Sequence, residues 1–306
     1  MRPEFLRVPT DRVAASARWT VRGECDRLTD VLLCGPAYLS PVPCCSATRE
    51  SLERGFSTDT ALAIRQHRRL REVLEERGVR CHQILPAPDL PDLCFTRDCA
   101  VTTPWGPVLL NPAMPHRRRE VRHVERHLLS LGMRPHRVTG GAIEGGDVCV
   151  AREGLAIIGI SGERTGPDGA EALATVFRAH GWDVILCHFD AYHLHLDTIF
   201  CMLDARHALA CIEALPQQFL DAVRARGIRL LDACHAEARA LACNIVSLDG
   251  HAVLVAAGQP RLSALLLKSG FDPVELDISQ FGACGGGLHC LTMPLARISD
   301  PSLRPG

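Results

Sequence analysis

A cysteine near the end of the chain follows a run of glycines, in the segment Gly285-Gly-Gly-Leu-His-Cys290. Glycine lets the backbone approach a ligand closely, and a thiol is a good nucleophile only as its thiolate, which a nearby cation stabilises. A bound guanidinium could itself be that cation. Cys290 is therefore a candidate nucleophile. The alternative is a buried structural thiol, because most of the 15 cysteines lie in apolar runs.

A histidine at position 195 is the candidate acid–base. If the segment His193-Leu-His-Leu-Asp197 is a strand, then His193, His195 and Asp197 share one face, since side chains alternate along a strand. A buried structural histidine is one alternative, and a zinc site on this face is another. Zinc is disfavoured because position 198 is a threonine instead of the further histidine of such metallohydrolase motifs, and no second ligand cluster stands out. We expect no metal.

Two acidic segments could bind a cation or orient the base. In Glu144-Gly-Gly-Asp147 the glycines permit a tight turn that presents both carboxylates, and an ordinary turn before a strand is the alternative. Asp98 follows Arg97, for which a local ion pair is the alternative.

Arginines could hold a substrate carboxylate through two parallel hydrogen bonds. The candidates are Arg164 and the basic run that begins at Arg117. For the basic run, a solvated helix face is the alternative.

The elements that must position these residues form a repeat. Five times, a helical stretch ends at a glycine, an apolar strand follows, and a pair of short apolar runs comes next. The predicted helices span Thr58–Gly78, Arg117–Leu131, Ala170–His180, Leu215–Arg226 and Arg261–Lys268. A period of about 50 residues indicates a repeat architecture, whose units must pack on one another to bury their apolar faces.

Equivalent positions of the repeat carry polar side chains. Four apolar runs begin at Asp98, Asp147, Asp197 and Asn244, and the fifth corresponding stretch carries Cys290. If the units close into a ring, these positions meet near its axis. Three carboxylates and a thiol would then share one pocket suited to a cationic substrate.

Composition limits the remaining classes. The chain has 306 residues, 47% hydrophobic and 23% charged, with a net charge of −1. These values suit one domain over residues 21–300, after a leader at 1–20 and before a tail at 301–306. Neither nucleic acid nor a membrane is expected as a partner. The chain has no Cys-x-x-Cys pair, so we expect free thiols and a reducing cytoplasm. The loop Gly35–Ser51, rich in proline and serine, is a hypothetical lid.

Several motifs together resemble one known group of enzymes. The matching segments are Phe95-Thr-Arg-Asp98, Glu144-Gly-Gly-Asp147, Arg164-Thr165, His195-Leu-Asp-Thr198 and Gly285-Gly-Gly-Leu-His-Cys290. In this order they resemble the guanidine-modifying superfamily of arginine deiminases, dimethylarginine dimethylaminohydrolases and amidinotransferases, over residues 21 to 297. The resemblance implies an α/β fold, a five-bladed propeller, which agrees with the five repeats.

The resemblance also implies roles. Cys290 is implied as the nucleophile, His195 as the general acid–base, and Glu144 as the group that orients it. The implied substrate-binding residues are Asp98 and Asp197 on the guanidinium, Asp92 elsewhere on the substrate, and Arg164 and Arg117 on its carboxylate; Asp147 joins them from its place in the repeat. The expected reaction is hydrolysis of a guanidino C–N bond through a covalent thiouronium, with no cofactor.

Three departures from the family patterns concern the substrate. Asp197 and Arg97 resemble arginine deiminases, although the chain is nearest to the short dimethylarginine dimethylaminohydrolase-like hydrolases. The segment Ser161-Gly-Glu-Arg-Thr165 has one residue more than the usual pattern, and His289-Cys290 resembles amidinotransferases and agmatine deiminases. The alternatives are therefore transfer of the amidino group to an amine, or a non-catalytic binding module. The expected partner is a small guanidino molecule as substrate. A homodimer is possible from the sequence.

Overall fold

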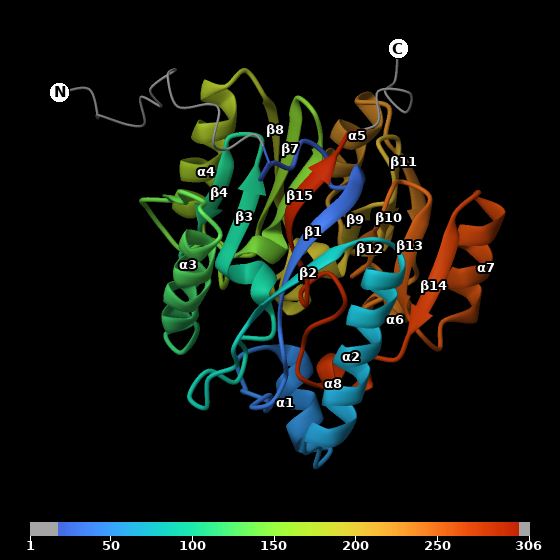
Figure 1. Cartoon of the computed structure of the whole chain (residues 1–306). Coiled ribbons are helices and arrows are strands. Elements are labelled where there is room, and N and C mark those ends of the chain that lie inside the picture. The colour runs from blue at the N-terminus through green and yellow to red at the C-terminus, as the bar shows by residue number, and fades with distance from the viewer. Residues whose placement is uncertain (1–17, 300–306) are drawn as a thin grey trace.

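A ring of five small sheets builds the part of the chain that the structure describes, residues 18–299 of a computed structural model (Figure 1). Each sheet has three strands, and a helix lies on its outer side. This architecture confirms the predicted five-bladed α/β propeller. The predicted leader and tail fall largely at residues 1–17 and 300–306, outside the described residues.

One blade shows how the sequence forms the repeat. Strands β6 (Val148–Arg152) and β7 (Leu155–Ile160) are antiparallel, α4 (Pro167–Ala179) follows, and β8 (Asp183–His188) returns parallel to β7. The helix ends before Gly181, whose φ of +79° favours glycine. The buried middle strand is apolar throughout, as a strand covered on both faces requires.

Three further blades repeat this order of hairpin, helix and parallel strand. The first consists of β3 (Ala100–Thr103), β4 (Gly106–Leu109), α3 (Glu120–Ser130) and β5 (His136–Arg137). The second consists of β9 (Phe200–Met202), β10 (His207–Ala210), α5 (Gln217–Ala225) and β11 (Arg229–Asp232). The third consists of β12 (Val246–Ser247), β13 (Ala252–Ala256), α7 (Pro260–Lys268) and β14 (Asp272–Leu276).

The fifth blade joins the two ends of the described chain. Strand β15 (Met293–Ile298) is antiparallel to β1 (Arg27–Cys34), and β1 is parallel to β2 (Arg80–Ile84), which follows α2 (Thr60–Glu76). Figure 1 shows β15 beside β1, red against blue. The ring is therefore closed by strand pairing between residues distant in sequence.

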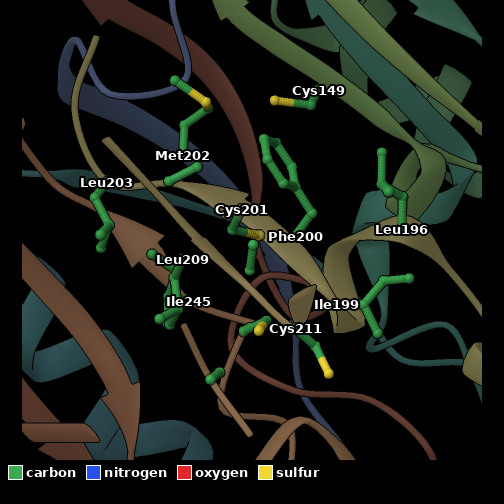
Figure 2. Packing of buried hydrophobic residues seen from close by; sticks show 14 of the residues in the cluster. Cys149, Leu196, Ile199, Phe200, Cys201, Met202, Leu203, Leu209, Cys211 and Ile245 are labelled. Atoms are coloured by element: carbon green, nitrogen blue, oxygen red, sulfur yellow. The ribbon is translucent and has the colours of Figure 1, made fainter. Parts of the chain in front are cut away.

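Apolar side chains fill the space between neighbouring sheets and helices. Figure 2 shows Cys149, Cys201 and Cys211 packed with Phe200 and Met202 in one such cluster. All fifteen cysteines are free thiols, and all except Cys44, Cys81 and Cys234 are buried. The interpretation that most of them are small buried hydrophobes is confirmed.

The predicted helices and strands are found with shifted ends, and three helices were not expected. The helix predicted from Arg117 begins as a 3₁₀ turn, Arg117–Arg119, before α3. The loop Gly35–Ser51 runs into α1 (Ser46–Glu53). Two short helices, α6 (His235–Arg239) and α8 (Ser279–Ala283), complete the fold. None of the described helices has the length and apolar character needed to cross a membrane.

The prediction of a strand through His193–Asp197 is wrong. Two 3₁₀ turns, Ala191–His193 and Leu196–Thr198, flank Leu194, whose φ is +51°. The Thr198 hydroxyl donates to the carbonyls of His193 and His195 at 2.6 and 2.8 Å, a local bonding pattern that competes with strand formation. His193 consequently leaves the face of His195 and packs edge-on against Tyr192.

Candidate active site

A small cavity brings together six of the nine predicted site residues: Asp92, Asp98, Arg117, Arg164, His195 and Cys290. Glu144, Asp147 and Asp197 are not among its lining residues. Its lining comes from several blades and from the loop before α1: Cys44, Cys45, Asp92, Phe95, Asp98, Arg117, Arg164, Leu194, His195, Cys284, Gly285, Gly286 and Cys290. Short 3₁₀ turns deliver the carboxylates, because Thr96–Cys99, Gly145–Asp147 and Leu196–Thr198 each lie just before the first strand of a blade. The repeat thus places equivalent residues around one axis.

The proposed nucleophile is buried and faces a carboxylate. Cys290 is 2% exposed, its Sγ accepts from Asn244 Nδ2 at 3.3 Å, and it lies 3.5 Å from Asp197 Oδ2. Burial, with Asp197 and Asp98 nearby, raises the pKa of this thiol well above its usual value. Without a ligand Cys290 is therefore a thiol, and a bound cation would favour its thiolate.

Asn244 also fixes the backbone around the thiol. Its Oδ1 accepts the N–H groups of His289 at 2.9 Å and Cys290 at 3.3 Å. A Cβ at Gly287 would lie 2.5 Å from this oxygen, so only glycine fits there. The glycine run therefore lets the Cys290 turn approach Asn244.

The predicted base and its partner are in contact. His195 Nε2 lies 2.8 Å from Glu144 Oε2, and Glu144 also accepts the Ala113 N–H at 3.0 Å. The other ring nitrogen, Nδ1, is 3.8 Å from Asp98 Oδ1 and has no hydrogen-bond partner among the described residues. A Cβ at Gly146 would lie 2.6 Å from Nδ1, so the ring requires this glycine.

The surrounding carboxylates keep His195 protonated. Burial alone would lower its pKa, but Asp98, Asp147 and Glu144 together raise the pKa to about 10. Glu144 has a lowered pKa despite its burial, chiefly because it bonds to His195. At neutral pH the pair is thus an imidazolium with a carboxylate, ready to donate a proton from Nδ1.

The two carboxylates expected to bind the guanidinium differ in surroundings. Asp98 accepts the Gly146 N–H at 3.0 Å and the Arg117 guanidinium, and despite burial its pKa is lowered to about 2, by His195 and Arg117. Asp197 accepts His289 Nδ1 at 2.8 Å through Oδ2, while its Oδ1 has no partner among the described residues. Asp197 therefore keeps a free oxygen beside Cys290.

Both arginines expected to hold a substrate carboxylate are already paired. Arg117 is buried and donates to Asp98 and, at 2.9 Å, to Glu120 Oε2, so the interpretation as a solvated helix face is wrong for Arg117, whereas Arg118 and Arg119 are exposed. Arg164 Nη1 donates to both oxygens of Glu144 at 3.2 Å. Buried cations need such partners. In the ligand-free protein these arginines neutralise the site's carboxylates, although both line the cavity.

Asp147 and Asp92 have contrasting places. Asp147 is fully buried and accepts the Leu196 N–H at 2.8 Å, so it links neighbouring blades. Like Glu144 and Asp197, it is absent from the cavity lining, and its contact with a substrate stays a prediction. Burial raises its pKa to about 6. Asp92 does line the cavity, and its Oδ2 lies 2.8 Å from His116 Nε2.

Sequence reasoning missed a buried network behind the nucleophile. His289 bridges Glu24 Oε1, 2.5 Å from its Nε2, and Asp197 Oδ2, 2.8 Å from its Nδ1. Arg97 Nη1 donates to Glu24 at 3.4 Å, which places Arg97 outside the cavity. Glu24 lies before the first strand and belongs to no motif, so nothing in the sequence singled it out. His289 could have been predicted as a site residue, because it is next to Cys290.

The zinc alternative on the His193 face fails, since that face does not exist. Another group, Asp98, Glu144 and His195, has ligand atoms within 4.8 Å of one another. The Arg117 and Arg164 guanidinium groups already bond to its carboxylates. The carboxylate charges of this group are therefore already balanced by arginines.

Taken together, the propeller and its Cys–His–carboxylate site define the class of protein as a guanidine-modifying α/β propeller. A family model described as eukaryotic N,N dimethylarginine dimethylhydrolase matches residues 45–297. An uncharacterized protein of Aeropyrum pernix is 34% identical over 79% of this chain and 87% of its own length. The chain belongs to this dimethylarginine dimethylaminohydrolase family.

Two named proteins extend the comparison. A dimethylarginine dimethylaminohydrolase of Streptomyces coelicolor is 28% identical over 79% of this chain and 89% of its own. The N-terminal domain of ArgZ, a cyanobacterial arginine dihydrolase solved with a covalently bound reaction intermediate, has a TM-score of 0.79 at 18% identity, covering 88% of this chain and 98% of that one. The latter likeness concerns the fold.

Proposed function

We propose that this protein hydrolyses a C–N bond of an arginine-like guanidino compound through a covalent thiouronium on Cys290. The observation that carries the proposal is the meeting of Cys290 and His195 in one cavity that Asp92 and Asp98 also line, with Glu144 bonded to His195 from behind. Family membership supports the same class of reaction.

The first step is binding of the planar cation. The guanidinium lies between Asp98 and the free Oδ1 of Asp197, beside the Cys290 thiol. Its positive charge lowers the thiol pKa, and the proton passes to Asp197 Oδ2, the carboxylate oxygen 3.5 Å from Sγ. The carboxylates act by positioning and by stabilising charge.

Covalent chemistry follows from the protonation state of His195. The Cys290 thiolate attacks the central guanidino carbon, forming the C–S bond. His195 Nδ1 then gives its proton to the departing nitrogen, and the C–N bond breaks to leave a thiouronium. Neutral His195 next takes a proton from water, which attacks the same carbon. The C–S bond then breaks, the ureido product leaves and loses its extra proton to solvent, and the Cys290 thiolate takes back the proton held by Asp197. Glu144 holds the imidazolium through Nε2.

The substrate proposed is arginine or a methylated arginine. Asp92, Arg117 and Arg164 line the cavity and can meet the amino-acid end of such a molecule. For the arginines to do so, the substrate carboxylate must compete with Asp98, Glu120 and Glu144 for their N–H groups. The Arg164 Nε has no partner among the described residues and is free for this contact.

The test is mass spectrometry of protein quenched in acid during turnover with arginine, methylarginines, agmatine and guanidino acids. We expect an amidino adduct on Cys290 and a released amine or ammonia. The Cys290→Ala variant should bind the same compound without adduct or product. If the amidino group appears only on an added amine, the reaction is amidino transfer and not hydrolysis. If the wild type binds these compounds without turnover, the protein is a non-catalytic binding module.

A further inference from the structure

A second and much larger cavity lies beside the catalytic one. Its volume is about 420 Å³, a usual size for a small-molecule site. The catalytic cavity measures about 20 Å³, room for little more than one water molecule. Helices α1, α6 and α8 and the turn at residues 192–194 form the walls of this side cavity. Leu194 and Gly285 line both cavities, so the two spaces meet there.

We propose that the side cavity binds a substituent on the leaving nitrogen of the guanidino substrate, and that this substituent ends in a carboxylate. The substrate then has two arms: an arginine-like arm towards Asp92 and Arg164, and an acidic arm towards α6. This inference rests on the proposed function, since it names the substrate class of the same site.

The place of Leu194 relates the side cavity to the leaving nitrogen. In the proposed reaction His195 Nδ1 protonates that nitrogen, and Leu194 is the residue before His195 in the chain. Asp92 and Arg164, which can meet the amino-acid arm, line the catalytic cavity but not the side cavity. A substituent on the leaving nitrogen therefore extends past Leu194 into the side cavity, whereas the amino-acid arm does not.

Backbone strain is concentrated at the side cavity. Among the described residues, Leu194 and Leu241 are the two non-glycine residues with positive φ, at +51° and +62°, and both line the side cavity. With a ψ of −69°, Leu194 has the conformation of a rare, strained γ-turn. The Thr198 hydroxyl holds this turn by donating to the carbonyls on either side of Leu194. Strain of this kind is typical of residues that the fold holds in place for a ligand.

The charges around the side cavity favour a carboxylate. Arg54 and Arg239 line it, and both donate to the one carboxylate of Glu50, at 3.2 and 2.6 Å. Two guanidinium groups thus share a single acidic side chain. His193 adds no charge at neutral pH, because burial and the neighbouring His235 lower its pKa. A carboxylate on the ligand balances the remaining positive charge through charge-assisted hydrogen bonds to Arg239.

The acidic arm leaves the steps of the proposed reaction unchanged. Cys290 Sγ forms a bond to the guanidino carbon, and the bond from that carbon to the substituted nitrogen breaks. His195 Nδ1 gives its proton to this nitrogen, so the arm leaves as an amine that carries the carboxylate. Water then releases the ureido product from sulfur. One water molecule is consumed in each turnover, and no oxidant or reductant takes part.

The test is isothermal titration calorimetry of Cys290→Ala protein, which needs no turnover. The ligands are arginine, a series of Nω-carboxyalkyl arginines of increasing chain length, and the matching carboxamides, which have the same shape without the charge. We expect a carboxyalkyl arginine of this series to bind about tenfold tighter than arginine and than its own carboxamide. Protein with Cys290 intact should release the corresponding amino acid from it.

Two substitutions in the side cavity should act mainly on the acidic arm. Arg239→Gln removes the partner of the carboxylate, and Ala236→Trp, at an exposed position of α6, fills the side cavity. In the Cys290→Ala background, each should weaken the carboxyalkyl ligand about tenfold more than it weakens arginine. Arg224→Gln, at an exposed arginine of α5 outside the side cavity, is the matched control and should change neither affinity.

Two results would overturn the inference. In the first, arginine binds but no carboxyalkyl arginine binds tighter than its carboxamide, which leaves the proposed function standing without this subsite. In the second, Arg239→Gln and Ala236→Trp weaken arginine as much as the carboxyalkyl ligand. Tight binding of the carboxyalkyl ligand without turnover by protein with Cys290 intact would support the subsite and refute the hydrolase. If no guanidino compound binds, the proposed function and the inference are both wrong.

Discussion

At the scale of single residues, the charges around Cys290 and His195 favour the binding of a cation. Cys290 faces Asp197, and burial, together with Asp197 and Asp98, raises the pKa of its thiol. Carboxylates also raise the His195 pKa to about 10 against the effect of burial. In the proposed reaction, a bound guanidinium offsets the charge of these carboxylates and so lowers the thiol pKa. It lowers the His195 pKa in the same sense, and we expect the value of about 10 without ligand to be high enough for His195 to stay an imidazolium that protonates the leaving nitrogen. Substrate binding and activation of the nucleophile are thus one electrostatic event.

His195 gives the pH dependence at this scale. Its folded-state pKa of about 10 lies above the value of 6.5 for the free side chain, so its stabilising contribution is complete below 6.5 and is lost as the pH rises towards 10. We expect the free energy of unfolding to fall across this window and to fall less in His195→Gln. The variant should also lower kcat by about 10²- to 10⁴-fold. Urea titrations at several pH values measure the first effect, and an unchanged slope between the two proteins would contradict it.

Glu24 is a positioning residue that acts through His289. Glu24→Gln removes the charge that holds His289 against Asp197, so we expect kcat to fall more than KM changes. Stability should drop by about 1–3 kcal/mol, because a buried charged hydrogen bond is weakened. Glu125→Gln, in a surface pair with Arg137, is the control and should change neither.

A result in which Glu24→Gln loses stability but keeps its kcat would assign the network to folding alone. The stability of the protein at low pH gives a second test of the role of Glu24. The Glu24 pKa is lowered from 4.5 to about 2, so its stabilising effect is present above 4.5 and is lost as the pH falls towards 2. The variant should lack this part of acid unfolding.

At the scale of elements, the hypothetical lid is the loop Gly35–Ser51, which runs into α1. Cys44 and Cys45 reach the cavity, while α1 is anchored by polar contacts at its outer face. Glu50 accepts Arg239 Nη2 at 2.6 Å and Arg54 Nη2 at 3.2 Å, and Ser46 donates to the Tyr192 carbonyl at 2.8 Å. Such exposed bonds are weak, as a lid requires.

Glu50→Ala should loosen this lid. We expect faster trypsin cleavage at Arg49 or Arg54 and a raised KM, with kcat within about twofold, because the anchoring pairs lie away from the reacting atoms. Glu53→Ala, exposed on the same helix, is the matched control. Cleavage rates should fall when Cys290→Ala protein is saturated with substrate. Rates that ignore both the Glu50 substitution and the ligand would argue against a lid.

At the scale of the whole molecule, stability depends on closing the ring. The β1–β15 pairing joins the two ends of the described chain, and each blade packs on its neighbours through the buried clusters. Loss of the closing strand should therefore weaken every blade.

Leu295→Ala tests this dependence. Leu295 is fully buried in β15, so we expect a loss of about 2–5 kcal/mol and one cooperative urea transition shifted as a whole. Leu267→Ala, whose side chain is 61% exposed on α7, is the control and should change little. Two separate transitions in Leu295→Ala would show that the blades unfold independently.

The sequence by itself determined the repeat and the order of its motifs. Apolar periodicity and glycine at helix ends are local properties of the chain. Gly181, for example, allows the positive φ that ends its helix whatever the rest of the fold is. The same repeat predicted that Asp98, Asp197 and Cys290 meet near one axis. The types of residue needed for the proposed reaction could therefore be read from the chain alone.

Only the tertiary structure decided which charges meet. Arg117 pairs with Asp98 across 19 positions, and His289 pairs with Glu24 across 265. Burial forces each charge to find a partner, and no local pattern encodes which partner the closed ring provides. For the same reason the sequence did not show that Asp147 accepts the Leu196 N–H and so links two blades.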